Sequence, residues 1–201
     1  MFKVLMLIVV SMSFVGCGYY ASEGSGYTAP PVAAPQGNSA SFKGMDTSTQ
    51  GNWKGAYGAD GNSIALGTPS IPSYASLSVA SDLLYNWASS TTDARGLSLP
   101  SSSSRNATCF YSQSSFSFDI KLTDGKLHQV AFYAVDWDNY TGGRKQTVQV
   151  SDGDTNVVLS SNVLSSFQGG VYLVYNMSGH VKVTITNNNS GNAVISGVFF
   201  N

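Results

Sequence analysis

Hydrophobic and polar residues alternate with a period of two in the centre of the chain. In the segment 115–122, SFSFDIKL, an extended backbone places Phe116, Phe118 and Ile120 on one side and the polar side chains on the other. This pattern predicts a half-buried β-strand. The following segment, 127–135, LHQVAFYAV, is almost continuously hydrophobic, which is typical of a central strand covered on both faces.

Further strands are predicted by similar patterns, with turn-forming residues between them. They lie at 145–150, 157–161, 171–177, 180–186 and 193–200, and more weakly at 53–58, 62–66, 75–80 and 85–89. Asp-Gly pairs in TDGK, 123–126, and SDGDTN, 151–156, predict hairpin turns. No convincing helical period is found, and 78–87 is expected to form one helical turn at most. Short strands with frequent turns predict an all-β fold, an antiparallel β-sandwich or jelly roll, over 52–201.

The first residues of the chain have the anatomy of a secretory signal peptide. Lys3 precedes an apolar run that is too short for a comfortable transmembrane helix and that ends in small residues next to Cys17. The sequence FVGC, 14–17, resembles the lipobox of bacterial lipoproteins, in which the cysteine carries the lipid. We therefore predict a lipoprotein-type signal peptide over 1–16. The protein is expected to be exported and lipid-anchored to a bacterial membrane or cell surface, or otherwise secreted.

Residues 17–51 are rich in Gly, Ser, Ala and Pro and show no apolar period, which predicts a flexible, disordered tether. The chain contains two cysteines. If Cys17 carries the lipid, Cys109 has no partner, so we expect no disulfide and a small buried thiol at position 109. The scarcity of Cys and His also argues against a zinc site.

The composition favours neutral polar partners. Charged residues make up 10% of the 201 residues, whereas about 25% is typical of soluble domains. A net charge of −1 offers no basic surface to a nucleic acid. Aromatic residues reach 12%, with 11 Tyr, which suits contacts with uncharged ligands. Extracellular β-proteins often share this composition, so it does not identify a ligand.

The segment 134–145, AVDWDNYTGGRK, carries the densest group of candidate binding residues. A pyranose ring has an apolar C–H face and a fringe of hydroxyls, so aromatic rings next to planar polar groups suit a carbohydrate. The predicted ligand-binding residues are Trp137, Tyr140, Asp138, Asp136 and Arg144. Two other aromatic segments, 52–62 with Trp53 and 84–96 with Trp87, either join the same rim or serve packing.

Two other interpretations of this segment involve its carboxylates and Arg144. In a structural interpretation, Trp137 belongs to the core and Asp136 or Asp138 pairs with Arg144 across the TGG turn. In a catalytic one, Asp136 and Asp138 lie about 7 Å apart on an extended backbone. This overlaps the spacing of about 6.5–9.5 Å in inverting glycosidases. Such carboxylates normally flank a cleft from different elements, which argues against catalysis here.

Calcium is a further alternative for the same carboxylates. Asp136 and Asp138 begin like an EF-hand loop, but the match fails at its fifth and twelfth ligand positions. A calcium site of another kind would need only clustered oxygen ligands, and Asp152 and Asp154 form a second acidic pair of this sort. We expect no cofactor other than such a structural calcium.

Residues from about 50 to 201 resemble a galactose-binding-like, carbohydrate-binding-module-like β-sandwich of secreted bacterial proteins. The segments that carry this resemblance are 53–61, 85–97, 109–150, 169–186 and 192–200. The resemblance implies non-catalytic carbohydrate recognition, and no binding residue is transferred from it. We predict a cell-surface recognition module for a neutral polysaccharide or surface glycan, without enzymatic activity. The alternatives are a structural or adhesive envelope protein with protein partners and, third, a glycoside hydrolase.

Overall fold

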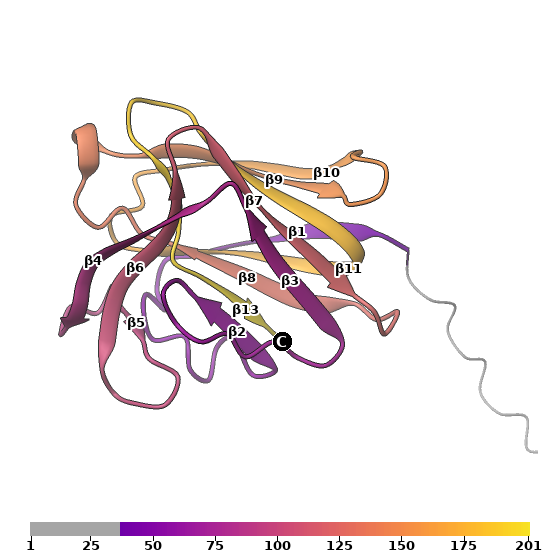
Figure 1. The fold of residues 1–201 in the computed structure, drawn as a ribbon, viewed down its shortest axis with the longest axis horizontal. Helices are drawn as coiled ribbons and strands as arrows, with labels where there is room; N and C mark the ends of the chain where they lie inside the picture. Colours follow the sequence, from indigo (N-terminus) through magenta and orange to yellow (C-terminus); the bar gives the residue numbers. More distant parts are fainter. Residues whose placement is uncertain (1–36) are drawn as a thin grey trace, which may run out of the picture. The chain divides into compact units, whose positions relative to one another are not determined.

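A computed structural model describes residues 37–201 as an antiparallel β-sandwich of thirteen strands, which confirms the predicted all-β class (Figure 1). The predicted signal peptide, Cys17 and most of the predicted tether lie outside the described residues. The strands are β1 (Ser39–Asp46), β2 (Gly61–Ile64), β3 (Ala75–Ala80), β4 (Leu83–Thr91), β5 (Leu97–Ser98), β6 (Arg105–Ser112), β7 (Ser115–Leu122), β8 (His128–Ala134), β9 (Lys145–Asp152), β10 (Val158–Ser165), β11 (Val171–Asn187), β12 (Ala193–Ile195) and β13 (Gly197–Phe200). One 3-10 turn, η1 (Tyr140–Gly142), interrupts them.

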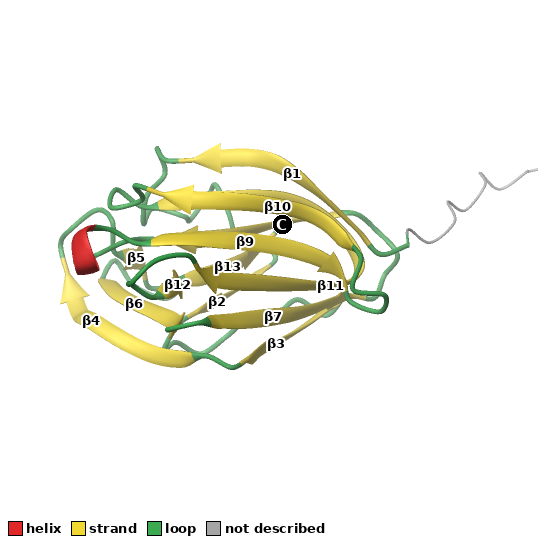
Figure 2. Cartoon of the chain, turned by 90° about the horizontal axis from the view of Figure 1, so that it is seen from above, coloured by secondary structure: helices red, strands yellow, loops and turns green. Residues whose placement is uncertain are grey.

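The longest strand, β11, runs through the centre of a nine-stranded sheet. Its first half pairs with β1 and β8, and its second half pairs with β7 and β9. Figure 2 shows β10, β9, β11, β7 and β3 side by side in one layer. The prediction of two strands separated by a turn at 178–180 is therefore wrong. Gly179 takes a positive φ of 69° there, which changes the pairing partners without reversing the chain.

The second sheet has four strands in the order β12-β6-β4, with β5 also pairing with β6. Its side chains pack on the main core, where the rings of Phe110 and Phe118 meet edge to face with centroids 5.5 Å apart. Phe116, Phe118 and Ile120 are all buried, as the alternation in 115–122 predicts. The continuously apolar β8 is buried from Val130 onward, as expected of a central strand. No helix within the described residues is long and apolar enough to span a membrane.

The sandwich begins earlier than the sequence predicts. β1 lies within the predicted tether of 17–51 and pairs along its length with β11. In its sequence, SASFKGMD, Phe42 is the one large hydrophobic residue whose side chain is partly buried, and Met45 is exposed. Since β1 is an edge strand held by its partner, local hydrophobicity does not reveal it. The domain boundary expected at 52 is thus corrected to the start of β1.

Two local predictions also need correction. The segment 78–87, expected to form one helical turn at most, instead ends β3 and begins β4, with a positive φ of 64° at Ser81 between them. The turn TDGK joins β7 and β8, but these strands pair with β11 and not with each other. By contrast, SDGDTN does connect two paired strands, β9 and β10, as predicted.

A polar cluster fixes the start of β1 to the sandwich. The side chain of Asn38 donates to Asp154 at 2.7 Å and accepts from the backbone N–H of His180 at 2.7 Å. The ring of His180 in turn contacts Asp119 at 3.0 Å and Asp154 at 2.7 Å. Hydrogen bonds to Asp119 and Asp154 raise the pKa of His180 above its ordinary value, against a smaller opposing effect of burial.

This cluster predicts a pH-dependent contribution to stability. A raised pKa in the folded state means that the contribution of His180 is fully present below pH 6.5 and is lost as the pH rises through the raised value. We expect His180→Gln to melt roughly 1–4 °C below the natural chain at pH 6 and to approach it at pH 9. A melting difference that stays constant from pH 6 to pH 9 would contradict the assignment.

Candidate functional site

A pocket of about 240 Å³ lies on one face of the β12-β6-β4 sheet. Cys109 and Tyr111, two apart on β6, line it from one face of that strand, and Tyr85 and Trp87 of β4 line it across an irregularity in pairing between Asn86 and Ala88. Val194 of β12, which pairs with Tyr111, continues the same surface. Cys109 is buried, as predicted, and forms part of the floor.

The remaining walls come from three loops. Asp138, Tyr140 and Arg144 belong to the segment that connects β8 with β9, and Gln113 and Asn192 come from the loops that follow β6 and β11. The pocket therefore combines four aromatic rings, two amides, a carboxylate and a guanidinium. Strands set the floor, and loops supply most of the polar groups.

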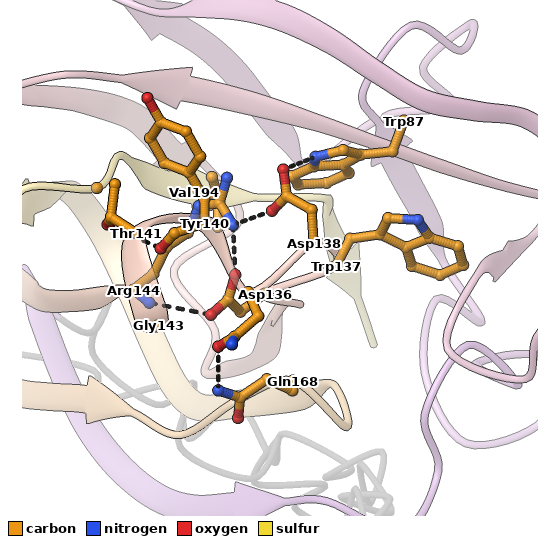
Figure 3. A network of polar contacts seen from close by, with 12 residues as sticks. Trp87, Asp136, Trp137, Asp138, Tyr140, Thr141, Gly143, Arg144, Gln168 and Val194 are labelled. Carbon is orange, nitrogen blue, oxygen red and sulfur yellow. Dashed lines mark hydrogen bonds and ion pairs between the residues drawn. The ribbon is translucent and has the colours of Figure 1, made fainter.

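A buried ion pair holds the β8–β9 loop in place. Asp136 is 1% exposed and Arg144 is 4% exposed. One carboxylate oxygen of Asp136 accepts a hydrogen bond from Nη1 of Arg144, and the other accepts from the Arg144 backbone N–H at 2.9 Å (Figure 3). The carboxylate thus binds both the main chain and the side chain of Arg144, so the two ends of the loop are joined.

Asp138 connects this loop to the sheet. It accepts a hydrogen bond from Nη1 of Arg144 through one oxygen and from Nε1 of Trp87, at 3.1 Å, through the other. Burial alone would raise the pKa of Asp138. The hydrogen bonds from Arg144 and Trp87 and the positive charge of Arg144 outweigh that effect and hold the pKa below its ordinary value. Asp138 is therefore an ionised hydrogen-bond acceptor at neutral pH.

The loop takes an unusual backbone path around Tyr140. Asn139 and Thr141 have positive φ angles of 49° and 54°, and Gly142 and Gly143 follow with 82° and 117°. Glycine tolerates such angles, which explains the Gly-Gly pair before Arg144. Nε2 of Gln168 donates to Oδ1 of Asn139 at 3.0 Å and supports the bend. As a result the ring of Tyr140, which is 47% exposed, faces the pocket.

The guanidinium of Arg144 lies between aromatic groups. Its carbon is 5.4 Å from the ring centroid of Trp87 and 5.4 Å from that of Tyr140, within the range of cation–π contacts. Its Nε is buried and has no hydrogen-bond partner among residues 37–201. The guanidinium is thus held by Asp136 and Asp138 and by its contacts with the two rings.

The structure brings together three of the five predicted binding residues. Asp138, Tyr140 and Arg144 line the pocket, whereas Asp136 lies behind Arg144. Trp137 does not line the pocket, and Figure 3 shows it pointing away from Arg144. Its ring is only partly buried and packs against the guanidinium of Arg95, whose carbon lies 4.4 Å from the ring centroid. The ion pairs of the structural interpretation are thus present, in the wall of a pocket.

Sequence analysis missed most of the residues that β4 and β6 contribute. The sequence offers Trp87 as a candidate for the same rim as Trp137 or for packing, but it does not single out Tyr85 or Tyr111. The signal was available in YNW, where two aromatic residues are two apart on a predicted strand, which places them on one face. Trp53, the other candidate for the same rim, is buried in the second core cluster.

The arrangement of Asp136 and Asp138 does not match a pair of catalytic carboxylates. Both contact the same nitrogen of Arg144, and Asp138 has a lowered pKa rather than the raised one that a general acid requires.

The carboxylates proposed as calcium ligands have other partners. Within residues 37–201 no three His, Cys, Asp or Glu side chains are grouped as metal ligands. Asp136 and Asp138 are bound to Arg144. Asp152 accepts from the backbone N–H of Asp154, at 2.8 Å, and from that of Thr155, as in a self-contained turn. These carboxylates are stabilised in the structure by protein donors.

The fold and pocket define an all-β sandwich with a pocket lined by aromatic and polar side chains. No protein-family model and no curated protein matches the chain. Among solved structures, it is similar to a carbohydrate-binding module, TmCBM61, determined in complex with beta-1,4-galactotriose. The sequence identity is 14%, the TM-score is 0.30, and the match covers 64% of this chain and 85% of the other.

Proposed function

We propose that this protein is a non-catalytic recognition module that binds a neutral carbohydrate in the pocket on the β12-β6-β4 sheet. The observation that carries the proposal is the combination of four aromatic rings with Asp138, Arg144, Gln113 and Asn192 around one pocket. Rings offer flat apolar surfaces to the C–H face of a sugar, and the polar groups offer donors and acceptors to its hydroxyls.

Charge supports a neutral rather than an acidic ligand. Two carboxylates, Asp136 and Asp138, share one guanidinium in the pocket wall, so the group as a whole is negative. A uronate or other acidic sugar would be repelled by this excess. A sugar hydroxyl, by contrast, can donate a hydrogen bond to the carboxylate of Asp138, whose side chain is 38% exposed.

Export and lipid anchoring at Cys17 form part of the same proposal. A signal peptide over 1–16 and a tether before β1 would present the pocket to glycans at the cell surface. Incorporation of a labelled fatty acid into the natural chain, and its loss in Cys17→Ala, would support the anchor. Equal labelling of both chains would contradict it.

The binding test compares two tryptophan residues. Trp87 lines the pocket, whereas Trp137, which the sequence predicts as a binding residue, lies outside it. On an array of neutral and acidic glycans, the full chain is expected to bind neutral ones, and Trp87→Ala to bind at least about 10-fold more weakly, which is about 1.4 kcal/mol. Trp137→Ala is the matched control, because it removes the same ring outside the pocket. We expect it to retain binding.

Three results would change this proposal. Loss of binding in Trp137→Ala with retention in Trp87→Ala would move the site to the other side of the β8–β9 loop. Sensitivity to a calcium chelator would assign the aspartates to a cation. No binding to any glycan by a chain with a normal melting curve would reject carbohydrate recognition.

A structural or adhesive role is the second candidate, favoured by the edge strand β4. Among residues 37–201, β4 pairs only with β6, and its residues Leu83 and Leu84 are 58% and 48% exposed. An exposed apolar edge strand is a template for pairing with another chain. Concentration-dependent self-association in sedimentation, suppressed by Leu83→Lys, would favour this role over glycan binding.

A further inference from the structure

The aromatic rings of the pocket form a corner rather than a strip. The planes of Tyr85 and Trp87 meet at 74° with centroids 5.9 Å apart, and those of Tyr85 and Tyr111 meet at 83° with centroids 6.1 Å apart. The ring of Tyr85 is therefore nearly perpendicular to the rings of both Trp87 and Tyr111. Coplanar rings in a row would allow successive sugar units of an extended chain to stack on them, and a perpendicular ring interrupts such a row.

The size of the pocket agrees with a small ligand. Its volume of about 240 Å³ lies just below the roughly 300–1,000 Å³ of pockets that enclose a drug-sized molecule. The floor formed by Cys109 and Val194 is closed, since both residues are fully buried in the core cluster. A single sugar unit fits such a space, while further units would have to project out of it.

The polar groups approach this space from different directions. Asp138 and Arg144 lie on the wall formed by the β8–β9 loop, and Gln113 and Asn192 come from two other loops. Hydrogen bonds to all of them require free hydroxyls around most of the sugar ring. A unit within a chain has lost two of these positions to glycosidic bonds, and a terminal unit has lost only one.

We infer that the pocket takes one terminal sugar unit of a neutral, soluble glycan, and not the interior of a chain or the flat surface of a crystalline polysaccharide. This inference depends on the proposed function, because it specifies the ligand of the same pocket. It assigns to Tyr85 the role of a specificity-determining residue that closes the corner.

The test measures how affinity depends on chain length. In calorimetric experiments the full chain is titrated first with the methyl glycosides of galactose, glucose, mannose, xylose and N-acetylglucosamine. It is then titrated with oligosaccharides of increasing length built from the same sugars. At least one methyl glycoside is expected to bind. Its longer oligomers should bind with an affinity within about 3-fold, at one protein per oligomer whatever the length.

Two variants of Tyr85 test the corner itself. This residue is 51% exposed, so replacing it should leave the fold intact. Tyr85→Ala is expected to weaken binding of the methyl glycoside at least about 10-fold, while Tyr85→Phe, which keeps the ring, retains binding within about 3-fold. Equal binding by Tyr85→Ala and the natural chain would overturn the role of the corner.

The outcomes separate the inference from the proposed function. Affinity that rises steadily with oligomer length, several proteins per chain, or adsorption to insoluble cellulose or chitin would overturn terminal recognition and leave carbohydrate binding standing. Absence of binding to every glycoside, oligosaccharide and polysaccharide would overturn both.

Discussion

Replacing Arg144 with methionine should lower the free energy of unfolding by about 3–5 kcal/mol. The reason is the environment of Asp136, which is 1% exposed and has the guanidinium of Arg144 as its ion-pair partner. Without Arg144, a buried carboxylate keeps only the backbone N–H of residue 144 as a partner. The cost of an unpaired buried charge far exceeds that of a lost surface ion pair. Urea denaturation measures the change directly.

Two companion variants make this prediction specific. Asp138→Asn removes the other carboxylate that contacts Arg144, but its side chain is much more exposed, so the expected loss is below about 1 kcal/mol. Adding Asp136→Asn to Arg144→Met removes the unpaired charge and keeps an acceptor for the backbone, and should restore about 2 kcal/mol. A loss for Arg144→Met as small as that for Asp138→Asn would show that the ion pair is not a structural fastener.

The same residue links stability with the proposed binding. Arg144 fixes the β8–β9 loop through Asp136 and presents its guanidinium to the pocket between Trp87 and Tyr140. A variant that removes it therefore changes both properties, and binding experiments on Arg144 alone would be ambiguous. Trp87 and Tyr85 are better probes of the ligand, because neither carries a buried charge pair.

The strands of the core could be predicted because their signal is local. A period of two in 115–122 requires only that one face of the strand is buried, and Phe116 and Phe118 satisfy this in any sandwich. The same holds for the continuous apolar run of β8. Fold class therefore follows from the sequence, because it depends on the number and type of such segments.

The pairing of strands could not be predicted in the same way. β11 changes its partners at Gly179, and β1 owes its place to contacts with residues more than a hundred positions away. Such contacts depend on the whole chain, and a sequence such as SASFKGMD has no periodic signal that reports them. The boundary at 52 was wrong for this reason.

The candidate site was predictable where it lies within one segment. The density of chemical groups in 134–145 predicts a site there, and one interpretation of the segment pairs Asp136 or Asp138 with Arg144, as the structure does. The opposite wall depends on the register that places Tyr85 beside Cys109 of β6. Sequence spacing shows that Tyr85 and Trp87 share a face, but not that this face meets the β8–β9 loop.

A chain that begins at Asn52 is expected to be much less stable than one that begins at Ala34. The shorter chain lacks β1, whose backbone hydrogen bonds to β11 contribute about 0.5–1.5 kcal/mol each. It also exposes Tyr175, which packs against Phe42 with ring centroids 5.2 Å apart. It further loses Gln50, whose carbonyl oxygen accepts the hydrogen bond of the buried Tyr172 hydroxyl at 2.6 Å.

Together these losses should amount to on the order of 5 kcal/mol, which lowers the melting temperature by roughly 10–20 °C. The chain from Ala34 is the matched control, because it lacks the predicted signal peptide and most of the tether but keeps β1. Equal melting of the two chains would mean that β1 is not part of the cooperative unit. If β1 is required for stability, a glycan array probed with the chain from Asn52 would test an impaired fold. Absence of binding by that chain would therefore not contradict the proposed carbohydrate binding in the pocket.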